Sequence, residues 1–199
     1  DTIDRDNSYY RIGAQLAERG FVVFAPHNLY RAEDRYRWLS RKANAVKGTL
    51  FSFILGQHDR ILAWLGSQPF VDASRIGFYG KSYGGETAVR IPAVLEGYAL
   101  SICSGDFNQW TRKVAATDQP WSFMRTIEWE MPYWNWGHTF DYAEMTYLIF
   151  PRPFMVERGH LDLVGRDQWV AHEYGKVQFL YAQLGLADRT EIEYFQGGH

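Results

Sequence analysis

The chain alternates between short apolar runs and longer segments with a helical period, and this alternation restricts the folds open to it. The apolar runs span residues 21–25, 75–79, 98–103, 153–157 and 191–195. Apolar residues recur at helical spacing in 9–19, 50–64, 86–95 and 169–184. Such alternation is typical of a parallel sheet with helices packed on it. We therefore predict an α/β fold, a three-layer sandwich with a mostly parallel sheet.

Composition narrows the class of protein further. With 199 residues, 46% hydrophobic and 22% charged, the chain has the composition of one globular domain. Lys and Arg number 21 against 23 Asp and Glu, so we expect no nucleic acid partner. No apolar stretch approaches the roughly 18 residues that span a bilayer, so we expect no membrane partner.

Cysteine usage says little about where the protein is located. The single cysteine, Cys103, excludes an internal disulfide and a cysteine-based zinc cage, but it does not fix the compartment. The sequence leaves localisation unknown, with secreted and periplasmic locations open, and does not predict the oligomeric state. No H-E-x-x-H pattern is present, so we expect no metal and no cofactor.

The most specific motif is Gly80-Lys81-Ser82-Tyr83-Gly84, which fits G-x-S-x-G between an apolar run and a helical segment. In a nucleophile elbow, a tight strand-to-helix turn holds the serine in a strained conformation, and the flanking glycines give the chain room to pass. This setting predicts Ser82 as a nucleophile. The backbone N–H of Tyr83 would point toward a developing oxyanion at the helix N-terminus.

A serine nucleophile requires a general base and a carboxylate that orients it. Asp162 follows the run 153–157 and His199 follows the run 191–195. Both would lie where a parallel sheet builds its site, at the carboxyl ends of the strands. We predict Asp162 as the acid, with Glu157 as the main alternative, and His199 as the base.

An aromatic-rich segment at 104–150 interrupts the alternation. It holds five of the eight tryptophans, and a connection of this length is far longer than usual, so we expect a cap or insertion within the domain. Aromatic faces stack on sugar rings, and Trp134 and Trp136 are the best candidates for contacting substrate. Most of these rings could equally form the core of the cap.

Taken together, these motifs resemble the α/β-hydrolase superfamily, in its bacterial dienelactone-hydrolase and acetyl-xylan-esterase-like branch. The resemblance rests on RIGFYGKSYGG, LSICSGDFNQW, PRPFMVERGHLD and the terminal GGH. It implies that Ser82 is the nucleophile, Asp162 the acid and His199 the base. It also implies three strands before 9–19 and a helix after His199 that this chain lacks, so we expect 1–199 to be a fragment of a catalytic domain.

The resemblance implies a serine hydrolase that cleaves carboxylic esters through an acyl-enzyme, with a small-molecule or acetyl-xylan-like carbohydrate ester as substrate. The triad also cleaves amides, so a peptidase of the prolyl-oligopeptidase kind stays open. An inactive hydrolase-like module that binds carbohydrate is a second alternative.

Overall fold

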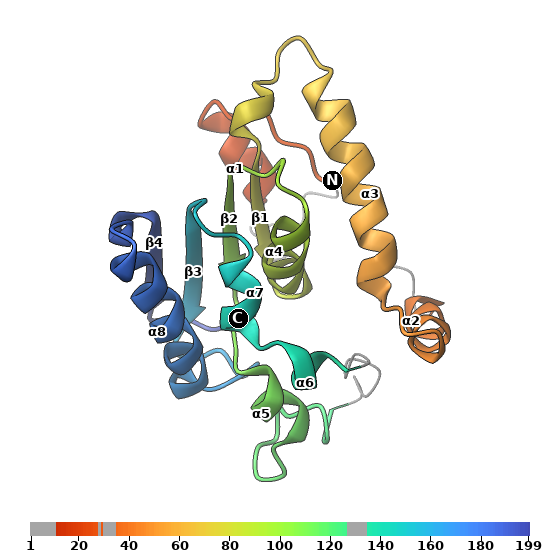
Figure 1. Cartoon of the computed structure of the whole chain (residues 1–199), viewed down its shortest axis with the longest axis vertical. Helices are drawn as coiled ribbons and strands as arrows, with labels where there is room; N and C mark the ends of the chain where they lie inside the picture. The colour runs from red at the N-terminus through yellow and green to blue at the C-terminus, as the bar shows by residue number, and fades with distance from the viewer. Residues whose placement is uncertain (1–10, 28, 30–34, 127–134) are drawn as a thin grey trace.

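Four parallel strands form a single sheet in the computed structural model, which describes residues 11–27, 29, 35–126 and 135–199. The strands are β1 (Gly77–Lys81), β2 (Leu100–Ser104), β3 (Phe154–Gly159) and β4 (Thr190–Phe195), and they lie in chain order (Figure 1). Each pairs in parallel with the next, with Gly80 opposite Cys103 and Val156 opposite Ile192. The predicted α/β class with a parallel sheet is confirmed.

Helices connect the strands and flank the sheet. The longer ones are α2 (Arg35–Ala45), α3 (Leu50–Gly66), α4 (Tyr83–Val94) and α8 (Asp167–Gln183); the shorter ones are α1 (Ile12–Glu18), α5 (Trp110–Ala115), α6 (Trp136–Thr139) and α7 (Tyr142–Tyr147). Two 3₁₀ turns, η1 (Ala73–Arg75) and η2 (Ala187–Arg189), precede β1 and β4. Capping boxes that begin at Thr49 and Asp141 start α3 and α7. Within the described ranges, no helix has the length and apolar content that crossing a membrane requires.

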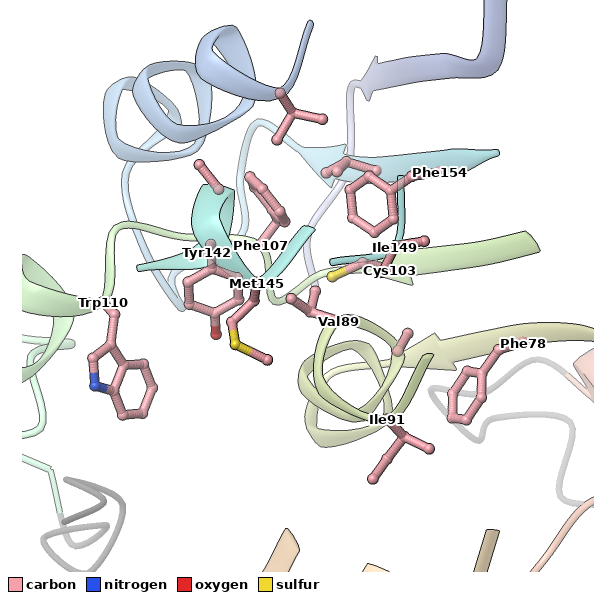
Figure 2. Packing of buried hydrophobic residues seen from close by; sticks show 14 of the residues in the cluster. Phe78, Val89, Ile91, Cys103, Phe107, Trp110, Tyr142, Met145, Ile149 and Phe154 are labelled. Carbon is pink, nitrogen blue, oxygen red and sulfur yellow. The ribbon is translucent and has the colours of Figure 1, made fainter. Parts of the chain in front are cut away.

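The core lies between the sheet and the helices α4, α7 and α8. Alternate strand residues face it, so that Cys103 and Val156 are fully buried beside Val89 and Ile149. Figure 2 shows these layers from close by, with Phe107 packed near Phe154 at a ring-centroid distance of 5.7 Å. Burial of this kind contributes about 25 cal/mol per Å² of apolar surface and fixes the strands that carry the site.

One strand prediction is wrong. Residues 21–25 form no strand, and Phe21 and Val22 are 62% and 61% exposed. A strand needs a neighbour to satisfy its backbone, whatever its own propensity. In the described part of the chain, β2 is the only partner of β1, and nothing pairs with 21–25.

The described part of the region 104–150 contains three short helices, α5, α6 and α7. In Figure 1, α5 and α6 lie beyond the sheet, at the end where the C-terminus is marked. The segment 28–47 contains α2. The helix predicted at 86–95 begins earlier, at Tyr83, directly after the serine of the motif.

Candidate active site

Ser82 lies at the turn between β1 and α4, in a backbone conformation that side chains rarely adopt. Its φ is 58° and its ψ is −122°, and it is the residue before the first turn of α4. Two hydrogen bonds fix this turn: Ser82 N–H donates to the Ser104 carbonyl at 2.9 Å, and Glu86 N–H donates to the Ser82 carbonyl at 3.0 Å. A strained non-glycine residue held in this way is typical of a functional position.

The motif glycines have different roles. A Cβ on Gly80 would lie 1.8 Å from the Gly84 carbonyl oxygen, and one on Gly85 would lie 2.6 Å from the Ser104 carbonyl oxygen. At Gly84 itself, a Cβ would meet nothing within 4 Å. The close approach of neighbouring backbone therefore requires glycine at positions 80 and 85. The G-x-S-x-G motif had predicted this requirement at Gly80 and Gly84.

His199 and Asp162 are brought together from the ends of β4 and β3. The His199 Nδ1 atom lies 2.9 Å from Asp162 Oδ2. An ionised carboxylate only accepts hydrogen bonds, so Nδ1 carries the proton and Nε2 is left as the basic nitrogen. Two backbone bonds hold the loop and the chain end together, from His160 N–H to the Phe195 carbonyl and from Leu161 N–H to the Gly197 carbonyl.

The Asp162 carboxylate is buried yet stays ionised. Burial by itself would raise the pKa of Asp162, but hydrogen bonds from His199 and from the Val164 N–H, together with the Arg158 charge, outweigh it and lower the pKa. The Val164 N–H donates to Asp162 Oδ1 at 2.8 Å. The acid is thus prepared to orient and charge-balance an imidazole.

Contacts through β2 link Ser82 to His199. The Ser104 carbonyl binds Ser82, and the next residue, Gly105, has its Cβ position 3.2 Å from Nδ1 and Cε1 of His199. The Gly105 N–H donates in turn to the Glu157 carbonyl at 3.0 Å. The three predicted triad residues therefore gather at the carboxyl end of the sheet, where such sites form in parallel α/β folds.

Glu157, the alternative acid, has another partner. Its Oε2 accepts a hydrogen bond at 3.1 Å from the hydroxyl of Tyr79, which lies on β1, two strands away in the sheet. The carboxylate bonded to His199 is that of Asp162. The geometry therefore favours Asp162 over Glu157.

Two of the remaining predicted residues, Tyr83 and Trp136, lie on helices in the described part of the chain. Tyr83 is the first residue of α4, where the backbone N–H groups point out of the helix end, and its ring stacks on Phe51 at 5.5 Å. Trp136 is half-buried in α6, and its ring lies 4.5 Å from the Arg90 guanidinium and 6.4 Å from the Trp110 ring. Trp134 lies outside the described residues.

Sequence reasoning missed a buried ion pair behind the elbow. Glu86 and Arg90, one turn apart on α4, are 1% and 3% exposed and form a salt bridge. The Arg90 guanidinium lies within 6 Å of rings from α3, α5, α6 and α7: Phe51, Trp110, Trp136 and Tyr142. The sequence signal that could have revealed this pair is the i,i+4 spacing of its two opposite charges. Through Arg90, the pair connects the 104–150 region to α4, the helix that begins after Ser82.

No group of three His, Cys, Asp or Glu side chains that could hold a metal ion occurs within the described ranges.

Solved structures with the same fold include both esterases and a peptidase. A putative acetyl xylan esterase from Bacteroides fragilis aligns with a TM-score of 0.73 and 17% identity over 92% of this chain and 49% of its own. A carbohydrate esterase family 15 glucuronoyl esterase from Caldicellulosiruptor kristjansonii gives 0.59 and 18% over 77% and 46%. An acylaminoacyl peptidase from Pyrococcus horikoshii gives 0.57 and 17% over 80% and 25%.

These similarities establish the fold, and this chain spans about half or less of the length of each of those proteins. The α/β-hydrolase fold expected from the sequence is confirmed; the dienelactone-hydrolase part of the resemblance stays a prediction.

A family model gives the more specific result. The prolyl oligopeptidase family matches residues 8–164, a range that includes Ser82 and Asp162 and ends before His199. Because this match covers well over half of the chain, the chain belongs to the prolyl oligopeptidase family of serine hydrolases.

Proposed function

We propose that this chain is the catalytic domain of a serine esterase, with Ser82 as nucleophile, His199 as general base and Asp162 as the acid that orients it. The observation that carries the proposal is the 2.9 Å contact between His199 Nδ1 and Asp162 Oδ2, at the same end of the sheet as the strained Ser82. The strained turn at Ser82 does not need the His199–Asp162 contact for its own structure, and that contact does not need the strained turn. Their meeting at one edge supports a catalytic role.

The reaction would proceed in two acyl-transfer steps. Ser82 Oγ attacks the ester carbonyl while His199 Nε2 takes its proton, and the imidazolium then gives that proton to the leaving alcohol. Water attacks the acyl-enzyme by the same route and restores the free serine and the acid product. The Tyr83 N–H, at the N-terminus of α4, would stabilise the oxyanion of each tetrahedral intermediate.

We further propose a carbohydrate ester as the substrate, with acetylated xylan as the type. Support comes from the aromatic content of 104–150 at the carboxyl end of the sheet, where α5 and α6 lie beyond the strands. Trp134 and Trp136 remain predicted sugar-contacting residues. Two of the similar structures are described as esterases of this general kind, an acetyl xylan esterase and a glucuronoyl esterase.

Labelling with a fluorophosphonate probe tests the nucleophile. We expect the wild type to be labelled and Ser82→Ala to be unlabelled, because only an activated serine reacts with the probe. Ser67→Ala is the matched control, since the hydroxyl of this exposed serine donates to the Trp64 carbonyl and accepts from Gln68; the variant should be labelled like the wild type. A wild type that unfolds cooperatively on heating but takes up no probe would refute the proposal.

Substrate choice is tested by hydrolysis rates. We expect p-nitrophenyl acetate and acetylated xylo-oligosaccharides to be cleaved faster than prolyl or acylaminoacyl p-nitroanilides. Faster cleavage of the anilides, still dependent on Ser82, would assign the chain to the peptidases of its family.

A further inference from the structure

Arg158 lies near the end of β3, and its side chain reaches into the loop that carries Asp162. That side chain is 3% exposed. The guanidinium donates to the Asp162 carbonyl at 3.0 Å and to the Gly165 carbonyl at 2.8 Å, and its Nε donates to Asp167 Oδ1 at 2.9 Å. One buried side chain thus fastens the loop at three points between β3 and α8.

The same guanidinium faces the Asp162 carboxylate. One terminal nitrogen lies 3.5 Å from Asp162 Oδ2, the oxygen that also contacts His199. The planar fork of arginine suits this task, because it can bond to carbonyls and carboxylates in several directions at once. A lysine ammonium in its place could reach only part of this set.

A buried guanidinium is costly unless its charge is balanced. Here Asp162 balances it on one side and Asp167 on the other, and Asp167 Oδ2 lies 2.6 Å from His160 Nδ1. Replacing such a cluster with apolar side chains of similar volume often leaves a protein equally stable. Stability is therefore a weak explanation for the presence of a buried arginine at position 158. Its position against the Asp162 carboxylate suggests a role in the candidate site instead.

We propose that Arg158 is a positioning residue for the triad acid, holding the Asp162 loop in place and its carboxylate against His199. This inference rests on the proposed function, because it assigns Arg158 a part in the same site. Arg158 touches no reacting atom in this arrangement, and its effect passes through Asp162.

Two separable effects follow. The positive charge favours the ionised form of the Asp162 carboxylate and so helps to keep the pKa of Asp162 low. The Arg158 guanidinium holds the Asp162 loop in place through its hydrogen bonds. Because Asp162 contacts His199, the position of the loop also sets the orientation of the His199 imidazole. Other charged or titratable groups around Asp162 and His199 are Lys81 at the end of β1, Asp106 after β2, His160 after β3 and Asp167 at the start of α8. None of these changes in the variants below.

The test is an NMR titration of the Asp162 carboxyl group in the wild type, Arg158→Gln and Arg158→Lys. Removing the charge in Arg158→Gln should raise the titration midpoint, since the Arg158 charge favours the ionised carboxylate. Arg158→Lys keeps the charge and should titrate near the wild type. The rate of fluorophosphonate labelling should fall roughly tenfold to a hundredfold in both, because the loop is no longer held.

Arg152→Gln provides a matched control. Arg152 also donates to several backbone carbonyls, those of Pro92, Leu95 and Tyr98, but it precedes β3, roughly 20 Å from the site at about 3.3 Å per strand residue. Its loss should lower the melting temperature without moving the Asp162 titration.

An unchanged Asp162 midpoint in folded Arg158→Gln would overturn the proposal. If Arg158→Gln does not fold, labelling of Arg158→Lys at the wild-type rate would overturn it, and slowed labelling would support it. The titration needs no catalysis, so a wild type that reacts with no probe would refute the proposed function while the titration still decided the role of Arg158.

Discussion

Replacing Gly80 with alanine tests the geometry on which the elbow depends. The new Cβ would lie 1.8 Å from the Gly84 carbonyl oxygen and 2.2 Å from its carbonyl carbon. To reach even 3.0 Å, the backbone at Gly84 must move by about 1.2 Å. Neither side can yield easily, because Gly80 is paired with Cys103 in the sheet and α4 is buried along most of its length.

Overpacking of this severity should cost about 3 kcal/mol of unfolding free energy. For a chain of this size, that lowers the melting temperature by about 6–12 °C. Displacing the start of α4 also displaces Ser82, so fluorophosphonate labelling should slow as well. Circular dichroism melts and labelling rates measure the two effects.

Gly84→Ala is the matched control in the same motif. Its Cβ would meet nothing within 4 Å, and Gly84 lies in the first turn of α4. Alanine in place of glycine in a helix should raise stability by about 0.5 kcal/mol. If the two alanine variants melt within a degree of one another, the argument from close approach is refuted.

Two further predictions concern buried charges. Burial lowers the pKa of His58 to about 4, so the unfolded chain takes up a proton below its ordinary pKa of 6.5 while the folded chain does not. Stability should therefore fall by roughly 2.5 kcal/mol between pH 8 and pH 4.5, and urea unfolding of His58→Gln should lack this component; an equal pH dependence in both proteins would contradict it. Arg90→Met should cost about 3–5 kcal/mol because it leaves Glu86 buried without its ion-pair partner, and Glu86→Gln combined with Arg90→Met should recover more than half of that loss. A double variant no more stable than Arg90→Met alone, by tryptophan fluorescence in urea, would show that the charge of Glu86 is not what is costly.

Elements whose cause is local were predictable from the sequence. The strand, turn and helix around Ser82 follow one another within about 20 residues, and each has its own signal in the apolar run, the glycines and the helical period. The strands at Phe154–Gly159 and Thr190–Phe195 were likewise found within a few residues of their observed bounds.

Where a structure depends on a partner, the sequence pattern failed or stayed open. Residues 21–25 have the composition of a buried strand, yet they are exposed because no described strand lies beside them. The choice between Asp162 and Glu157 could not be made from position, since Glu157 ends the apolar run that Asp162 follows. The structure distinguishes them because Tyr79, from another strand, bonds to Glu157, while His199 bonds to Asp162.

By itself, the sequence determined the class of fold, the tight strand-to-helix turn at Ser82 and the candidates for acid and base. Each of these depends on short-range rules of backbone sterics, hydrophobic periodicity and turn chemistry. Only the tertiary structure decided which carboxylate contacts His199, that Arg158 fastens the Asp162 loop, and that Arg90 joins α4 to the aromatic region. Those contacts join residues from different strands and helices, and their distances are set by packing of the whole core.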